Sequence, residues 1–205
     1  LVIALFGVVG TLGAGYIAQA AQMYRAGVAR AELMDEASGV ARRISREVAA
    51  SLPNSLRVSI AADGSYLELI PVSAAGRYRA QASVSAEPGG NNPLEFAASL
   101  VDTSFQVLGP GLDIAAGGSL VIANLGHSAA DAYAGNNRRT PTVTGTGLTS
   151  VSFNAGPGAF PLDSPDQRVF VVGSPVSFRC ASDGTLTRHT GYAWSATQPT
   201  LAGGG

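Results

Sequence analysis

The stretch LVIALFGVVGTLGAGYIAQAAQMYR, residues 1–25, decides the fold expected for this chain. Its first 24 residues contain no Asp, Glu, Lys or Arg, and Arg25 is the first charged residue. A charge-free run of this length is long enough to span a bilayer as a helix, which takes about 20 residues. We therefore expect residues 1–24 to form a hydrophobic helix that lies in a membrane or packs against copies of itself.

Two sets of residues in this segment are expected to matter. The apolar side chains that would face lipid or other helices are Leu1, Val2, Ile3, Leu5, Phe6, Val8, Val9, Leu12 and Ile17. The small residues Gly7, Gly10, Gly13 and Gly15 would let another helix approach closely. They fit either ordinary small-residue packing or a specific hinge, and the sequence leaves both interpretations open.

The helix is expected to continue through residues 25–52, because Pro53 is the first proline of the chain. Apolar residues at steps of three or four draw a stripe along this second half. The stripe includes Leu33, Val40, Ile44, Val48 and Leu52. It predicts a helix face that packs on the domain that follows.

Residues 53–205 have the pattern of a β-rich domain. Two short β-type runs, 56–60 and 66–70, flank the turn dipeptide Asp63–Gly64 and predict a hairpin. Further strands are expected within 78–84, 105–111, 119–126, 148–154, 167–173 and 176–180, with a second hairpin over 185–194. Residues 126–139 have no strand pattern and are expected to form a surface loop or a short helical turn. The predicted fold class is α+β, a long N-terminal helix packed on a mostly antiparallel sheet domain.

The composition limits the possible functions. The net charge of −1 gives no basic surface for nucleic acid. Cys180 is the one cysteine, so it is either buried and free or paired with a partner outside this sequence. The histidines, His127 and His189, do not fall in a metal-ligand spacing. Asp163 and Asp166 flank a Ser–Pro pair and fit a turn better than a cation site. We expect no catalytic residue, no cofactor and no metal, and hence no enzyme.

Several segments together resemble a known family. The start LVIALFGVVGTLGAG resembles the helix that follows the class III leader motif of type IV pilins and pseudopilins. Segments across nearly the whole chain resemble the MshO-type minor pilins of the mannose-sensitive haemagglutinin (MSHA) type IV pilus system. They include ARRISREVAASLPNSLRVS (41–59), NLGHSAADAYAGNNRR (124–139), FPLDSPDQRVFVV (160–172) and PVSFRCASDGTLTRHTGYAWSATQP (175–199).

This resemblance implies a minor pilin that helps to initiate assembly and lies at or near the fibre tip. Its partners would be other major and minor pilins, the inner membrane before assembly and the assembly platform. The head would be periplasmic before assembly and extracellular afterwards. A processing motif with N-methylation would precede Leu1, and Cys180 would pair with a cysteine beyond Gly205. The alternatives are a pseudopilin of a type II secretion system and a tip adhesin that uses the loops 126–139 or 155–166.

Overall fold

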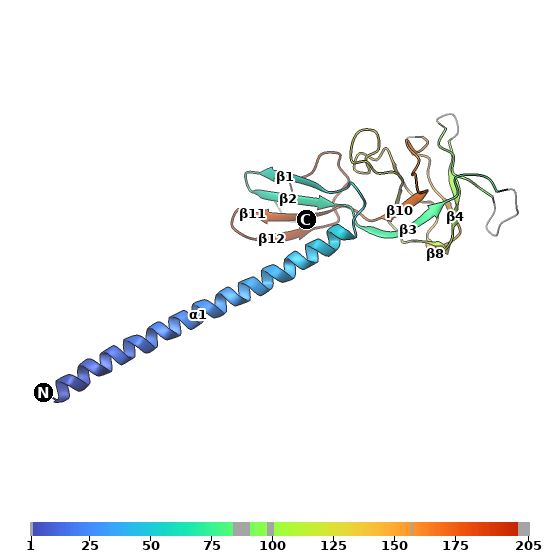
Figure 1. Ribbon diagram of the computed structural model, residues 1–205. Coiled ribbons are helices and arrows are strands. Elements are labelled where there is room, and N and C mark those ends of the chain that lie inside the picture. Colours follow the sequence, from blue (N-terminus) through green and yellow to red (C-terminus); the bar gives the residue numbers. More distant parts are fainter. Residues whose placement is uncertain (1, 84–90, 98–100, 157, 201–205) are drawn as a thin grey trace. The chain divides into compact units, whose positions relative to one another are not determined.

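The computed structural model describes residues 2–83, 91–97, 101–156 and 158–200. An N-terminal helix, α1, precedes the strands β1 to β12 (Figure 1). All the strand pairs are antiparallel, so the predicted α+β class with an antiparallel sheet domain is confirmed at this level. The chain divides into two compact units, Leu1–Glu47 and Val48–Gly205. The second unit is called the head below.

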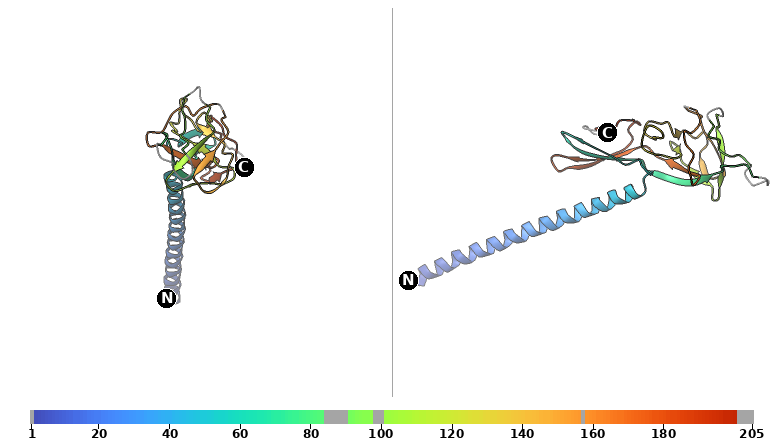
Figure 2. Two further views of the ribbon diagram at one scale, coloured as in Figure 1. Left: turned by 90° about the vertical axis from the view of Figure 1, so that its right-hand side faces the viewer. Right: turned by 45° about the horizontal axis from the view of Figure 1, so that its top comes forward.

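Helix α1 runs without interruption from Val2 to Ala49, 48 residues, which corresponds to a length of about 72 Å (Figure 2). The helix ends before the predicted Leu52, because the next residues bond to another part of the head. The Leu52 amide donates to the Ile70 carbonyl at 2.8 Å, and the Val72 amide donates to the Ala50 carbonyl at 3.2 Å. These bonds draw the backbone out of the helical path.

The prediction of a transmembrane helix over residues 1–24, and of an inner-membrane location, is wrong. Among the described residues, no helix has both the length and the apolar character needed to cross a bilayer. A segment without charged residues can still carry polar side chains. Tyr16, Gln19, Gln22 and Tyr24 are uncharged, but their polar groups cost free energy in hydrocarbon.

The first sheet of the head has four strands in the order β1-β2-β11-β12 (Figure 1). Their bounds are β1 Arg57–Ala61, β2 Gly64–Leu69, β11 Val176–Ala181 and β12 Leu186–His189. Both predicted hairpins are confirmed, as β1–β2 and β11–β12. Gly64 is required at the first turn, since a Cβ there would lie 2.3 Å from the Cys180 carbonyl oxygen and its φ is +149°.

The second sheet has six strands in the order β7-β6-β10-β3-β4-β9. The bounds are β3 Val72–Tyr78, β4 Ser104–Leu108, β6 Ser119–Val121, β7 Arg138–Arg139, β9 Ser150–Ser152 and β10 Arg168–Val172. A separate pair joins β5 Leu112–Ile114 to β8 Gly145–Leu148. The strand expected within 78–84 is wrong, because β3 ends at Tyr78 and its alternating residues precede that position. The strands expected within 105–111 and 119–126 are present as β4 and β6, and these two strands are not neighbours in the sheet.

Strand β10 lies inside the second sheet and is buried on both faces. Val169 and Val171 belong to one hydrophobic cluster, with Phe105 and Phe153. Val172 belongs to a second cluster, with Leu52, Ile70, Val121 and Tyr133. Because side chains alternate along a strand, one strand supplies both clusters. Leu52, predicted to lie on a helix stripe, is therefore a core residue of the head, with 1% of its surface exposed.

We predict that Leu52→Ala lowers the free energy of unfolding of the head by about 3 kcal/mol, because it removes buried methyl groups and leaves a cavity. The matched control is Leu56→Ala, since Leu56 is 47% exposed. The measurement is urea unfolding followed by the fluorescence of Trp194, the one tryptophan of the chain. Equal losses for the two variants would contradict the assignment of Leu52 to the core.

Candidate functional site

The apolar residues predicted at the start of α1 lie at its surface wherever they are described. Val2, Ile3, Phe6 and Ile17 are 66%, 88%, 74% and 70% exposed. Leu1 lies outside the described residues, as do the side chains of Leu5, Val8, Val9 and Leu12. Among the described residues, these four exposed side chains therefore lack the apolar packing found in the core of the head.

The glycines of α1 leave open space on its surface. Apart from the glycine, its two chain neighbours and the nearby backbone of the helix, no described atom lies within 4 Å of the position that a Cβ would take at Gly7, Gly10 or Gly15. Gly13 lies outside the residues whose surroundings are described. This open surface is compatible with close approach of another helix. Close packing and a hinge both remain predictions.

The predicted stripe divides between the two units. Leu33, Val40 and Ile44 lie on α1 within the first unit, whereas Val48 and Leu52 belong to the head. Leu33 is 66% exposed. Packing of the α1 part of the stripe on the head stays a prediction.

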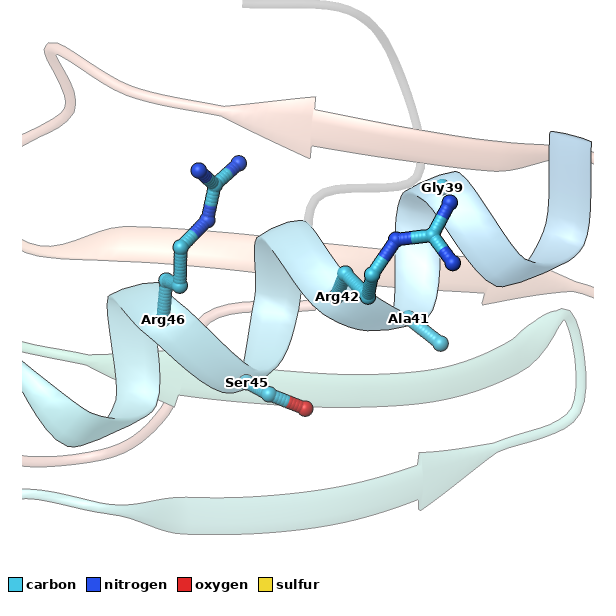
Figure 3. A pocket seen from close by; sticks show the side chains of 5 residues that line it. All are labelled: Gly39, Ala41, Arg42, Ser45 and Arg46. Carbon is cyan, nitrogen blue, oxygen red and sulfur yellow. The ribbon is translucent and has the colours of Figure 1, made fainter.

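A hollow on the surface of α1 is lined by Gly39, Ala41, Arg42, Ser45 and Arg46 (Figure 3). All five residues come from one helix. Ligand sites are usually built where polar groups converge from several elements. We therefore assign no binding role to this hollow.

The most concentrated polar chemistry of the head surrounds Glu68 on β2. Its side chain is fully buried, with 0% exposed. One carboxylate oxygen accepts a hydrogen bond from the Arg57 guanidinium, and the other accepts one from the Tyr192 hydroxyl at 2.7 Å. A buried charge is tolerated only when it is paired and hydrogen-bonded, and both oxygens of Glu68 meet this condition.

Arg57 connects Glu68 to the C-terminal segment, residues 190–200. Its two terminal nitrogens donate to the carbonyl oxygens of Ala196 at 2.7 Å and Ser195 at 2.9 Å. Its guanidinium also lies 3.6 Å from the centre of the Tyr133 ring, a cation–π contact. One arginine therefore joins the sheet, the loop 126–139 and the C-terminal segment.

Trp194, in the C-terminal segment, adds another ring to the polar and aromatic cluster formed by Glu68, Arg57, Tyr133 and Tyr192. Its ring lies 6.3 Å from that of Tyr133 in an edge arrangement, and the Arg138 guanidinium lies 3.8 Å from its centre. No backbone–backbone hydrogen bond joins the described residues 190–200 to the rest of the head. Side chains attach this segment instead. Arg57 donates to its backbone carbonyls, and Tyr192 donates to Glu68. The Trp194 ring packs against that of Tyr133, and Gln198 donates to the Tyr66 carbonyl.

The loop 126–139 is more buried than the sequence predicted. Its buried residues are Ala130, Ala132, Tyr133, Asn137 and Arg139, and its end forms strand β7. The prediction of a surface loop is therefore wrong for its second half. The alternative of a short helical turn fits there, because the Gly135 amide donates to the Asp131 carbonyl at 3.0 Å. His127, Ser128 and Ala129 remain exposed. A loop dense in Asn and Arg can satisfy its own backbone through side chains, and this signal was available in the sequence.

Side-chain hydrogen bonds explain how this loop can be buried. The Asn137 amide donates to the Ile122 carbonyl at 3.2 Å, and the Tyr133 hydroxyl donates to the Ser55 carbonyl at 2.9 Å. Arg139, 2% exposed, donates to four carbonyl oxygens, those of Asn136, Arg138, Gly158 and Ala159. These bonds fix the loop against the core and against the segment 158–159.

Burial shifts the pKa values of the nearby tyrosines and arginines in the direction that favours the neutral form of each side chain. The pKa of the Tyr192 phenol lies well above its ordinary value, first because the group is buried and second because it donates to the Glu68 carboxylate. Burial likewise raises the pKa of Tyr133. Burial lowers the pKa of Arg138 and of Arg139. The phenols are therefore held neutral as hydrogen-bond donors.

The other residues singled out from the sequence do not converge on one site. His127 accepts from the Ala129 amide at 3.3 Å through Nδ1, and His189 contacts the Thr187 hydroxyl at 2.9 Å. Asp166 pairs with Arg168 at 3.4 Å. Within the described residues, no group of three or more His, Cys, Asp or Glu side chains is placed to hold a metal ion.

Cys180 is exposed on β11, so the alternative of a buried free thiol is wrong. It faces Ser65 of β2 and Leu186 of β12 across the sheet. Pairing with a cysteine beyond Gly205 stays a prediction.

Comparison with known proteins identifies no relative. No family description, curated protein or solved structure matches this chain. The resemblance to MshO-type minor pilins therefore stays a hypothesis that rests on the quoted segments.

We predict that Glu68→Gln lowers the stability of the head by about 3 kcal/mol, because Arg57 loses its buried counter-charge. The control is Glu95→Gln, an exposed carboxylate, which should change stability by less than about 0.5 kcal/mol. Limited proteolysis should also cut the C-terminal segment faster in Glu68→Gln. An unchanged unfolding midpoint and cutting rate would refute a structural role for Glu68.

A second prediction concerns alkaline pH. The unfolded chain releases the Tyr192 proton near its ordinary pKa of 10, whereas the folded chain retains it to higher pH. The stabilising contribution of this phenol is therefore complete below about pH 10 and declines as the pH rises above it. Denaturant unfolding across this range should give a shallower decline for Tyr192→Phe than for the native chain. Parallel pH profiles would contradict the assignment.

Proposed function

We propose that this protein is a filament subunit, a minor pilin of an MSHA-like type IV pilus that helps to start assembly near the fibre tip. The observation that carries the proposal is α1, a 48-residue helix that forms a compact unit of its own as far as Glu47. Its described N-terminal side chains are apolar and exposed. The sequence segments that resemble MshO-type minor pilins support the same assignment.

The exposed apolar side chains of α1 need a partner surface to become buried. A long helix in water is stabilised mainly by packing of its apolar face. Ile3 and Phe6, at 88% and 74% exposure, lack such packing within this chain's described residues. Equivalent helices of other subunits would provide it, and the glycines at 7, 10 and 15 would permit close contact.

Two alternatives share this architecture. A type II secretion pseudopilin would use the same helix in a different machine. A tip adhesin would add contact through loops of the head, and the exposed residues of loop 126–139 include His127, Ser128 and Ala129. The buried half of this loop favours a structural role over adhesion.

Quantitative mass spectrometry of sheared, purified pili from the native host tests the proposal. We expect the chain at trace stoichiometry relative to a major pilin. Abundance equal to the main subunit would make it a major pilin. Absence from pili would reject the proposal and favour the secretion pseudopilin, and loop variants that make pili but fail to attach would favour the adhesin.

We also predict that Phe6→Asp reduces incorporation into filaments by tenfold or more, about the effect of 1.4 kcal/mol, because a carboxylate would be buried among apolar helices. The control is Val101→Asp, since Val101 is exposed on the head, at 59%. Trp194 fluorescence should show a folded head in both variants. Equal incorporation of the two variants would argue against helix packing in the filament.

A further inference from the structure

Strand β1 is an open edge of the first sheet. It stands first in the order β1-β2-β11-β12, and in the described chain its backbone pairing is with β2. In an antiparallel pair, alternate residues direct their N–H and C=O groups away from the partner. The outer side of β1 therefore presents unpaired backbone groups, which can template the addition of another strand.

Three other sheet edges, those at β7, β9 and β12, differ from β1. The edges of the second sheet are short, with two residues in β7 and three in β9. Strand β12 carries the charged Arg188. Strand β1 has five residues and no proline or lysine. Its charged residue, Arg57, is turned toward Glu68 and the carbonyls of Ser195 and Ala196.

The side chains of β1 define what would fit beside it. Val58 and Ile60 lie on one face and are 66% and 83% exposed. Ser59 lies between them and faces the other side of the sheet, where its Oγ is buried without a hydrogen-bond partner. An added strand should therefore bring apolar residues next to Val58 and Ile60.

We propose that the occupant is the β1 edge of a second copy of this chain, paired antiparallel about a two-fold axis at Ser59. The strand reads RVSIA, so it has an apolar residue on each side of the central serine. In this pairing Val58 lies opposite Ile60 of the partner subunit, and Ser59 lies opposite Ser59 of the partner subunit. Arg57 lies opposite Ala61 of the partner subunit, so no like charges face each other.

The pairing makes the two four-stranded sheets continuous. Because the same patch is used on both copies, the contact closes after two copies. A five-residue edge buries less than the roughly 1,200 Å² of a stable interface, so the dimer is weak and depends on concentration. The paired residues all belong to the head, so the proposal does not depend on the proposed pilin function.

A charge-swap experiment on the full chain tests this pairing. One variant carries Val58→Lys and Ile60→Lys, and the other carries Val58→Glu and Ile60→Glu. In a symmetric antiparallel pair, each variant places like charges opposite each other, which should weaken its dimer by about tenfold or more. A mixture of the two variants places Lys opposite Glu and should restore dimers. Both positions are exposed, so folding should be retained.

Sedimentation measures the dimers, in detergent that covers the apolar surface of α1. The matched control is Val101→Lys, an exposed apolar position outside β1, which should associate as the native chain does. The proposal is overturned if the native chain stays monomeric at millimolar concentration. It is also overturned if the lysine variant dimerises as strongly as the control, or if the mixture associates no better than either variant alone. Pilus incorporation is scored separately, so failure of either proposal is recognisable.

Discussion

The buried carboxylate of Glu68 is the constraint around which the head is organised. A charge with no contact to water must be neutralised and hydrogen-bonded where it lies. Arg57 from β1 and Tyr192 from the C-terminal segment meet this requirement. Because Arg57 also contacts Tyr133, the same charge draws the loop 126–139 into place. Three segments distant in sequence therefore depend on one side chain.

The C-terminal segment shows how far side chains alone can order a chain. Its described residues make no backbone–backbone hydrogen bond to the head, yet the rings of Tyr192 and Trp194 lie in the polar and aromatic cluster. Each contact is worth about 1 kcal/mol or somewhat more. The order of this segment therefore relies on several contacts acting together, and a change at Glu68 or Arg57 affects all of them.

The two units follow different physical rules. The head buries its apolar residues in two clusters that share β10. Helix α1 exposes its described apolar residues and has open space at Gly7, Gly10 and Gly15. The proposed assembly uses α1, whereas the proposed pairing uses only β1 of the head. The two proposals can therefore be tested separately in one chain.

The sequence by itself determined the local structure. The proline-free amphipathic run gave α1, and the turn at Asp63–Gly64 and the alternating runs gave both hairpins, because these patterns depend on near neighbours. Lack of charge over residues 1–24 was a misleading guide to apolarity. Only the tertiary structure decided that Leu52 enters the core, that much of residues 130–139 is buried, and that Glu68, Arg57, Tyr133 and Tyr192 meet. Those contacts join residues far apart in the chain, and no local periodicity encodes which distant groups will neutralise a buried charge.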